Sequence, residues 1–494
     1  MKLKGMTQVM ELNELIGPGA ALPNGDGVDI AGLTADSREV APGYLFAALP
    51  GVNVDGAKFI ADALDKGAAA ILSGPETGAD ALTVPHLIDR NPRRRFALMA
   101  ARFYGAQPET VAAVTGTNGK TSIASFTRQL WELQGLKAAS LGTLGIETAG
   151  ETRPLGFTTP DPVRLQKELA ALAGEGIAML AMEASSHGLA QHRMDGVKIT
   201  AAAFTNITRD HMDYHATFGD YLYAKLRLFG EVMGPGGVAV LNADADQFAE
   251  FEAVSWARGH RIIAVGRRGQ DICLEGVRAH PRGQTLQIIH KGEHYEIDLP
   301  LVGEFQASNA LVAAGLVIGC GAEVGKTFEA LSSLRGVRGR LEEAAHLENG
   351  ASVFIDYAHT PDALANALNA LRPHAKGRLL VVFGCGGDRD KGKRPEMGRI
   401  AAELADGVFV TDDNPRSEKP AAIRAEIMAG APEAVEIGDR AEAIRIAMDA
   451  LGAGDVLVVA GKGHETGQTI GAKTIPFSDH EAVASALQKM GGQA

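Results

Sequence analysis

Short apolar runs alternate with helical patterns along nearly the whole chain of 494 residues. Runs of this kind, bounded by turns and followed by amphipathic stretches, are typical of buried strands in parallel sheets covered by helices. The pattern predicts an α/β fold with largely parallel sheets. At roughly 150 residues per domain, the length suggests about three domains. We place them at residues 1–108, 109–340 and 341–494, with linkers near Pro108 and Arg340.

Composition and charge exclude several classes of protein. Lys and Arg number 48 and Asp and Glu 60, which gives a net charge of −12, and aromatic residues are only 5%. An acidic, aromatic-poor chain is a poor sequence-independent nucleic-acid binder. Its three cysteines are far apart, which suggests neither a disulfide framework nor a zinc site. With no signal-peptide pattern and no long apolar run, we expect a cytoplasmic protein that does not insert into membranes.

The strongest local signal is a glycine-rich loop, GTNGKT, between an expected strand at residues 111–114 and an expected helix at residues 121–133. Backbone N–H groups and a helix N-terminus favour phosphate at such a loop. Lys120 would reach the β and γ phosphates, and the Thr121 hydroxyl would bind Mg²⁺. The usual first glycine is replaced by Val114. An ordinary glycine turn is the alternative, but the strand, loop and helix stand in the register of a nucleotide site.

Two further residues follow expected strands at positions suited to magnesium. Glu183 ends the apolar run at residues 177–182, where an acid can bind Mg²⁺. A solvated glutamate at a strand end is the alternative. His211 follows the strand expected at residues 201–205, although a lone histidine is more often a core or surface residue.

The third segment contains four expected strands that each end in a polar or glycine-rich loop. Ligands of open α/β sheets bind at the carboxyl ends of strands, so these loops predict a built site. The strands are expected at residues 353–356, 379–383, 408–411 and 456–460. In the second segment, residues 285–299 alternate as a hairpin turning at Lys291 and Gly292.

Nine motifs occur in a recognisable order: GTNGKT, MEASSHGLAQHR, TNITRDHMDYH, AKLRLF, GEFQASN, DYAHTPDAL, FGCGGDRDKGKRP, TDDNPR and AGKGHE. In these motifs the chain resembles the Mur ligases, most closely the MurE type of peptidoglycan precursor synthesis. The resemblance implies an ATP-dependent ligase that adds meso-2,6-diaminopimelate to UDP-N-acetylmuramoyl-L-alanyl-D-glutamate. The reaction would pass through an acyl phosphate and give ADP and phosphate. The implied domains bind the UDP-sugar, ATP (a P-loop-type sheet) and the amino acid (a Rossmann-like domain).

The resemblance also implies roles for individual residues of this sequence. The ATP contacts would be Gly116, Thr117, Asn118, Gly119, Lys120, Thr121, Ser122, Asn309, Arg340 and Asp356. The contacts of the UDP-linked dipeptide would be Ser37, Thr158, Thr159, Ser185, Gln191 and Arg193. The contacts of diaminopimelate would be Arg389, Asp413, Asn414, Pro415, Arg416, Gly461 and Glu465.

The catalytic set implied by the resemblance comprises Lys120, Glu183, His211 and Lys225. Taken alone, Lys225 fits a surface lysine in a helical pattern. The resemblance instead makes it a lysine that reacts with CO₂, so that the resulting carbamate binds a second Mg²⁺. Thr121 and Glu183 would hold the first ion, and His211 would join the carbamate at the second. We expect a monomer.

Arg416 is expected to determine which amino acid the enzyme accepts. Its planar fork matches the distal carboxylate of diaminopimelate, which L-lysine lacks, and Asp413 and Glu465 could take the distal ammonium. The alternative for DNPR is an N-capping turn before a helix at residues 421–428, and both roles are compatible. The competing functions are the same ligation with L-lysine, a folylpolyglutamate-synthetase-like ligase, another muropeptide ligase step and a P-loop switch protein.

Overall fold

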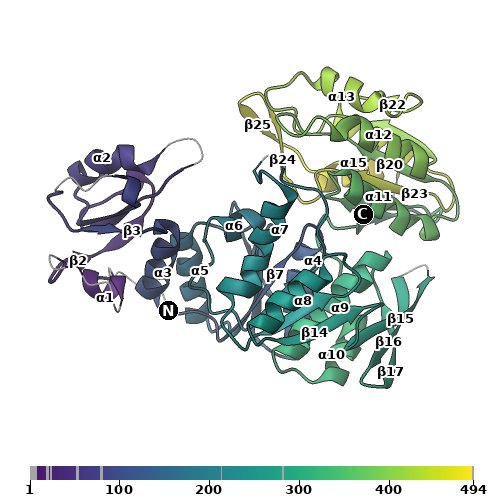
Figure 1. The fold of residues 1–494 in the computed structure, drawn as a ribbon. Coiled ribbons are helices and arrows are strands. Elements are labelled where there is room, and N and C mark those ends of the chain that lie inside the picture. Colours follow the sequence, from purple (N-terminus) through teal and green to yellow (C-terminus); the bar gives the residue numbers. More distant parts are fainter. Residues whose placement is uncertain are drawn as a thin grey trace. The chain divides into compact units, whose positions relative to one another are not determined.

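The computed structural model describes residues 8–17, 22, 25–51, 55–77, 82–212, 214–280 and 283–491 (Figure 1). Its contacts divide the chain into two compact units. The first unit comprises Met1–Thr115, Lys137–Ala202 and Tyr223–Gly237, and the second comprises Gly116–Leu136, Ala203–Leu222 and Val238–Ala494. The chain passes from the first unit to the second within β12 (Ala201–Phe204) and returns within α7 (Phe218–Arg227).

The first unit begins with a four-stranded parallel sheet in the order β3-β4-β5-β6. Leu45 and Leu72 pack with α3 on one face, and Phe46 and Ile71 pack with α2 on the other. Burial of both faces explains why these strands are continuous apolar runs. The elements are β3 (Gly32–Thr34), β4 (Tyr44–Ala48), β5 (Ala70–Ser73), β6 (His86–Ile88), α2 (Ile60–Asp65) and α3 (Pro92–Tyr104). The chain before them forms β1 (Met10–Glu11), α1 (Leu12–Ile16) and β2 (Asp29–Ile30).

A second set of strands in the first unit has the order β10-β9-β8-β11-β7. β8, β11 and β7 are parallel, so their carboxyl ends share one edge, and β9 and β10 add antiparallel pairs. β11 ends at Glu183, as predicted. The elements are β7 (Thr110–Thr115), β8 (Ala138–Gly142), β9 (Gly145–Glu147), β10 (Thr152–Arg153), α5 (Pro162–Gly174), β11 (Met179–Glu183) and α6 (Ser186–Ala190).

The second unit contains the strand order β13-β14-β15-β16-β17. β13, β14 and β15 are parallel, and β15, β16 and β17 are antiparallel. The predicted hairpin turn is confirmed, because Lys291 (φ 51°) and Gly292 (φ 85°) join β16 to β17 with the two positive φ angles of a tight turn. The elements are α4 (Lys120–Leu133), β13 (Val238–Asn242), α8 (Phe248–Ala257), β14 (Arg261–Gly266), β15 (Ile272–His280), β16 (Gly283–His290), β17 (Glu293–Leu299), α9 (Glu304–Gly319) and α10 (Val324–Ala330).

The C-terminal part of the second unit is a doubly wound sheet in the order β18-β19-β23-β20-β21-β22 (Figure 1). Only β18 is antiparallel to its neighbour. Helices α11, α12 and α13 pack on one face, and α14 and α15 pack on the other. The Rossmann-like prediction is therefore confirmed.

The predicted strand ends of this sheet are confirmed to within one residue. The elements are β18 (Glu342–His346), β19 (Ser352–Asp356), α11 (Pro361–Leu371), β20 (Leu379–Phe383), α12 (Lys393–Leu404), β21 (Gly407–Val410), α13 (Pro420–Met428), β22 (Val435–Glu436), α14 (Arg440–Asp449), β23 (Val456–Ala460), β24 (Gly467–Ile470), β25 (Lys473–Pro476) and α15 (Asp479–Lys489).

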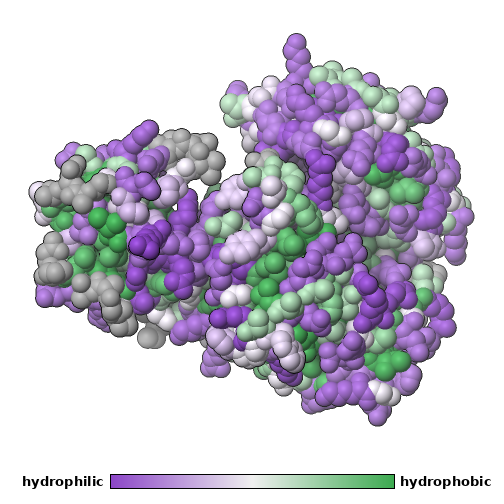
Figure 2. Space-filling model, viewed as in Figure 1, coloured by the Kyte–Doolittle hydropathy of each residue, from purple (hydrophilic) through white to green (hydrophobic). Residues whose placement is uncertain are grey.

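The face drawn in Figure 2 carries mostly hydrophilic residues, and its hydrophobic residues gather in several patches among them. Across the described ranges, no helix is long and apolar enough to cross a membrane. The α/β fold class is confirmed. The domain boundaries at residues 108 and 340 stay predictions.

Candidate active site

The glycine-rich loop leads into α4 and closes on itself. Lys120 Nζ donates to the carbonyl oxygens of Gly116 (2.9 Å) and Thr117 (2.8 Å). Gly119 has φ 88°, and a Cβ there would lie 2.5 Å from Asn309 Oδ1, so this position requires glycine. α4 begins with no side-chain hydrogen bond at its cap residue, Gly119. An uncapped helix start of this kind binds phosphate through its N–H groups.

Residues that follow β12 hold the same loop. Thr117 Oγ1 lies 2.9 Å from Tyr221 Oη, and Thr205 Oγ1 donates to the Asn118 carbonyl oxygen (2.7 Å). Asn118 N donates to Asn206 Oδ1 (3.0 Å). Two consecutive residues of the loop, Thr117 and Asn118, are thus held by the residues after β12 and by Tyr221 of α7.

His211 lies in this segment with a left-handed backbone (φ 56°) and a side chain that is 42% exposed. Its Nε2 lies 3.4 Å from Asp210 Oδ2. Burial raises the pKa of Asp210, but nearby His211, His359 and Lys120 outweigh it, so the pKa lies below its ordinary value. Asp210 is therefore a carboxylate within the field of Lys120.

The predicted ATP contacts Arg340 and Asn309 converge on this loop. Arg340 Nη2 donates to Thr121 Oγ1 (3.2 Å), and its guanidinium lies 4.4 Å from the centroid of the Tyr357 ring. Gln306 joins the two residues, because its Nε2 donates to the Arg340 carbonyl oxygen (3.1 Å) and its Oε1 accepts from Asn309 Nδ2 (3.0 Å). The segment before β18 is thus fastened to α9 and α4.

Asp356, the third predicted ATP contact outside the loop, fixes the residue after Arg340. Its Oδ2 accepts from Leu341 N (2.6 Å) and its Oδ1 accepts from Ala358 N (2.8 Å). Leu341 has φ 51°, a strained value for a leucine. Burial raises the pKa of Asp356 to about 6. The second unit therefore brings together the loop, Asn309, Arg340 and Asp356.

Glu183 in the first unit is 1% exposed, so the alternative of a solvated glutamate is wrong. Its Oε1 accepts from Thr143 N (2.7 Å), and its Oε2 accepts from Thr143 Oγ1 (3.1 Å). Thr143 Oγ1 also lies 3.0 Å from Thr158 Oγ1, and Thr159 Oγ1 donates to the Glu183 carbonyl oxygen (3.1 Å). The proposed metal ligand is thus hydrogen-bonded directly to one predicted dipeptide contact, Thr159, and is linked to a second, Thr158, through Thr143.

The remaining dipeptide contacts of this unit, except Ser37, extend the same network. Ser185 Oγ donates to Thr159 Oγ1 (3.0 Å), and Arg193 Nη1 donates to the Thr159 carbonyl oxygen (2.6 Å). Arg193 Nη2 also donates to Gln191 Oε1 (2.7 Å). Ser37 lies instead after β3, where its carbonyl oxygen accepts from Lys66 Nζ (2.8 Å).

Lys225 lies in α7 and is 1% exposed, so the alternative of a surface lysine is wrong. Arg227, two residues later, is also buried and donates to Asp195 Oδ1 (3.2 Å) and to His192 Nδ1 (2.8 Å). α7 then passes into a π-helical turn, Leu228–Val232. Such turns often mark functional sites.

The predicted metal ligands can be compared with the oxygen donors that Mg²⁺ prefers. No group of three or more His, Cys, Asp or Glu side chains able to hold a metal occurs in the described part of the chain. Mg²⁺ keeps several waters and is usually bound through one or two carboxylates and substrate phosphates. The buried Glu183 carboxylate of the first unit and the Thr121 hydroxyl of the second unit are each oxygen donors of the kind that Mg²⁺ prefers.

The DNPR and GKGHE loops touch at the carboxyl edge of the C-terminal sheet. Asn414 Nδ2 donates to Glu465 Oε2 (2.8 Å). Gly461 has φ 114°, and a Cβ there would lie 2.8 Å from Asp413 Oδ2. Glycine at this position therefore lets the two loops approach. Four predicted amino-acid contacts come together here, and Pro415 follows directly on Asn414.

Arg416 extends this cluster to the loop after β20. It is half-buried, and its Nη1 donates to the Gly387 carbonyl oxygen (2.8 Å). α13 begins at Pro420, and its cap residue, Lys419, makes no side-chain cap bond. The alternative of DNPR as a helix cap is therefore wrong.

A buried arginine, Arg394 of α12, joins the loop after β20 to Glu418, two residues after DNPR. Arg394 is 0% exposed and donates to Glu418 Oε1 (2.8 Å) and to the Gly386 carbonyl oxygen (3.2 Å). Arg389, predicted to touch the amino acid, is exposed and donates to the carbonyl oxygen of its neighbour, Asp388 (3.1 Å). It lies on the joined loops without reaching the cluster.

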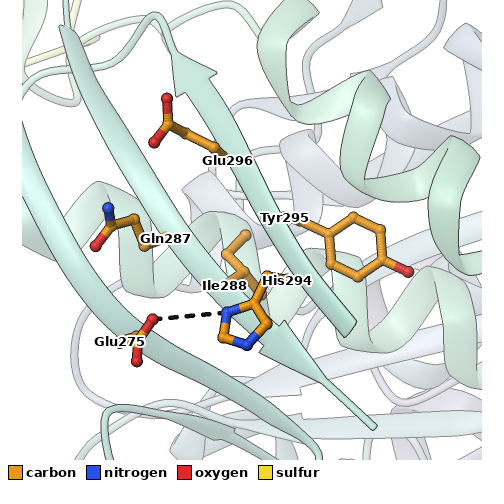
Figure 3. A pocket seen from close by; sticks show the side chains of 6 residues that line it. All are labelled: Glu275, Gln287, Ile288, His294, Tyr295 and Glu296. Carbon is orange, nitrogen blue, oxygen red and sulfur yellow. Dashed lines mark ion pairs between the residues drawn. The ribbon is translucent and has the colours of Figure 1, made fainter. Parts of the chain in front are cut away.

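A hollow lies elsewhere in the second unit, on the β15–β17 strands (Figure 3). His294 Nδ1 there lies 3.8 Å from Glu275 Oε2, and both side chains are exposed. The predicted site residues do not line it. Its lining residues are Glu275, Gln287, Ile288, His294, Tyr295 and Glu296.

Comparison with known proteins identifies the family. Three family models match, described as Mur ligase family, catalytic domain (residues 29–104), Mur ligase middle domain (residues 114–317) and Mur ligase, glutamate ligase domain (residues 339–463). A curated relative from Bradyrhizobium diazoefficiens, a UDP-N-acetylmuramoyl-L-alanyl-D-glutamate–2,6-diaminopimelate ligase, is 55% identical over 97% of this chain and 99% of its own. The chain belongs to the Mur ligase family.

Solved structures agree with this placement. A Mur ligase with the same printed name as the Bradyrhizobium relative superposes with a TM-score of 0.70 at 33% identity, over 94% of this chain and 96% of that one. The Mycobacterium tuberculosis folylpolyglutamate synthase superposes with a TM-score of 0.63 at 19% identity, over 81% of this chain and 95% of that one. The second likeness shows a shared fold alone.

Four residues of this Mur ligase were missed by sequence reasoning: Thr143, Gln306, Arg394 and Lys462. Lys462 stands inside the quoted AGKGHE motif, and Gln306 inside GEFQASN. The sequence predicted the residues next to them, which could contact a ligand directly. These four side chains instead make hydrogen bonds that hold other parts of the site. Thr143 has no local signal, since its contact with Glu183 arises from the pairing of β8 with β11.

Proposed function

We propose that this chain is an ATP-dependent ligase that joins meso-2,6-diaminopimelate to UDP-N-acetylmuramoyl-L-alanyl-D-glutamate and releases ADP and phosphate. The observation that carries the proposal is the 55% identity, over nearly the whole length of both chains, to a relative named for this ligation. The enzyme therefore acts in peptidoglycan precursor synthesis. A cytoplasmic location and a monomeric state of the enzyme stay predictions.

The chemistry needs an activated carboxylate, because an amine does not attack a carboxylate anion at a useful rate. Transfer of the ATP γ-phosphoryl group to the glutamyl carboxylate forms an acyl phosphate, and attack by the amine of diaminopimelate expels phosphate. Two anions must meet in the first step, so their repulsion has to be offset by cations and oriented N–H groups. We assign this work to Lys120, Arg193 and the first turn of α4.

Magnesium belongs to the proposal through the donors described above. Bound ions would neutralise phosphate charge and orient the γ-phosphoryl group. We propose Thr121 and Glu183 as ligands of one ion, and His211 with a CO₂-derived carbamate on Lys225 as ligands of the second. Complete burial of Lys225 supports this role, since a buried carbamate oxygen would be a hard, anionic ligand.

The ligand contacts are proposed as the sequence predicted them. ATP would lie against residues 116–122, Asn309, Arg340 and Asp356. The dipeptide would lie against Thr158, Thr159, Ser185, Gln191 and Arg193, with its nucleotide near Ser37. Diaminopimelate would lie among Arg389, residues 413–416, Gly461 and Glu465. The half-buried fork of Arg416 and the Glu465 carboxylate, which is bonded to Asn414 two residues before Arg416, support a substrate with both charges at its far end, which favours diaminopimelate over L-lysine.

A ligase assay with a panel of amino acids tests the proposal. We expect phosphate release to require ATP, the UDP-linked dipeptide and diaminopimelate together, with little release when L-lysine replaces diaminopimelate. Product analysis should find ADP and phosphate in equal amounts to the ligated product. Stoichiometric AMP and pyrophosphate would refute the acyl-phosphate route, and equal use of L-lysine would refute the assigned substrate.

A further inference from the structure

Lys462 is a fully buried cation at the centre of the amino-acid site. Its side chain is 0% exposed, and its Nζ donates to Glu465 Oε2 (2.9 Å) and to Asn414 Oδ1 (3.2 Å). Asn414 Nδ2 donates to the same Glu465 Oε2 (2.8 Å). The three side chains therefore form a closed triangle of hydrogen bonds that joins the GKGHE loop to the DNPR loop.

The triangle fixes which atoms remain for a ligand. Glu465 Oε2 accepts two hydrogen bonds, and Asn414 Oδ1 accepts a second one from Thr469 N (2.9 Å). Within the described residues, Glu465 Oε1 accepts no hydrogen bond, and the Glu465 side chain is 30% exposed. One oxygen of this carboxylate is thus held inside the protein, and the other is left for a cation.

The buried charge of Lys462 is paired with the carboxylate of Glu465, whereas the other buried cation nearby, Arg440, has a different partner. Asp413 and Glu465 are close enough to Arg440 that both raise its pKa, although burial is the largest influence on that group and lowers it. Arg440 itself is paired with Asp479 (2.7 Å). Lys462 is therefore the cation that directly balances Glu465. Removing one partner from a buried pair is strongly destabilising to the charge left behind.

We propose that Lys462 is a positioning residue for diaminopimelate, which holds Glu465 and Asn414 so that Glu465 Oε1 faces the ammonium of the substrate. This inference rests on the proposed function and assigns no direct contact, because a side chain without exposed surface cannot touch a ligand. Without Lys462, the Glu465 side chain would rotate toward solvent. Ordering that side chain when the substrate binds would then cost free energy of binding. The loss would therefore fall on the binding of the amino acid.

Steady-state kinetics of Lys462→Met and Lys462→Gln test the inference. We expect KM for diaminopimelate to rise about 10- to 100-fold for Lys462→Met, with kcat within about threefold and KM for ATP unchanged. Lys462→Gln, which keeps a donor without the charge, should lie between Lys462→Met and the wild type. Lys473→Met, at an exposed lysine of β25, serves as the matched control and should match the wild type.

A double-mutant cycle separates positioning from general loss of structure. If Lys462 acts through Glu465, Lys462→Met should raise KM for diaminopimelate less than threefold in a Glu465→Gln background. Full additivity, or an unchanged KM in both Lys462 variants, would overturn the inference. Should Lys462→Met not fold, the same comparison is made with Lys462→Gln. Wild-type turnover of diaminopimelate is measured first, and its absence would refute the proposed function rather than the role of Lys462.

Discussion

Replacement of Arg416 by alanine tests the part of the site that distinguishes diaminopimelate from L-lysine. Arg416 has five N–H donors, of which one on Nη1 is committed to the Gly387 carbonyl oxygen (2.8 Å). Among the residues that the structure describes, its side chain makes no second hydrogen bond, so the rest of the fork remains for a planar acceptor. The backbone is held independently, because Arg416 N donates to the Thr469 carbonyl oxygen (3.0 Å) and Gly471 N donates to the Arg416 carbonyl oxygen (2.7 Å).

The expected loss follows from that geometry. Two N–H···O bonds to a carboxylate would be charge-assisted, and each is worth about 1.5–3 kcal/mol before the exposed part of the side chain is taken into account. A half-buried pair of this kind should therefore contribute about 2–4 kcal/mol, or about 30- to 1000-fold in KM for diaminopimelate. Arg416→Lys should recover only part of this, since a point charge cannot reproduce the fork.

The assay measures initial rates with ATP, the UDP-linked dipeptide and each amino acid in turn. KM for ATP should not change, and L-lysine should remain a poor substrate. Arg416 has φ 50°, so Arg416→Gly is included to separate backbone strain from loss of the side chain. Arg399→Ala, at an exposed arginine of α12, is the matched control. An unchanged KM for diaminopimelate in both Arg416→Ala and Arg416→Gly would refute the assignment.

Three further perturbations have defined outcomes. Lys225→Ala should nearly abolish kcat, with partial recovery on adding acetate or another short carboxylate, and a fully active variant would refute the carbamate. Burial lowers the pKa of His464 from 6.5 to about 4. Between these pH values the His464 side chain binds a proton in the unfolded chain but not in the folded chain. The folded state therefore loses stability as the pH falls from 6.5 toward 4. His464→Gln should show a shallower fall in Tm across that window, and identical slopes would contradict the buried neutral ring. Gly461→Ala should raise KM for diaminopimelate about tenfold, because the new Cβ would displace the Asp413 carboxylate and because φ is 114° at this position, which strains an alanine. Kinetics identical to the wild type would show that the two loops need no glycine there.

Much of the fold could be predicted because strands and loops carry local signals. The apolar run that ends at Glu183 and the strands at residues 379–383 and 456–460 stand where the pattern placed them. Their carboxyl ends identified the loops that hold the candidate site. Lys291 and Gly292 marked their hairpin through turn chemistry alone.

The supporting contacts could not be predicted, since they depend on which strands become neighbours. Thr143 meets Glu183 only because β8 pairs with β11, although the two residues are separated by 40 positions. Lys462 and Asn414 lie on loops after different strands, and no periodicity indicates that they touch. The burial of Lys225 also had no signal, because a lysine in a helical pattern is usually exposed.

The hydroxyl of Thr143, shared between Glu183 and Thr158, has a thermodynamic consequence for the order of substrate addition. If magnesium at Glu183 changes the affinity for the UDP-linked dipeptide at Thr158, then the dipeptide must change the affinity for magnesium by the same factor. At equilibrium, the effect of each ligand on the affinity for the other is therefore the same. Any apparent sequence of binding would then reflect the concentrations and rates at which the two ligands arrive, and a single hydroxyl would transmit the reciprocity between them.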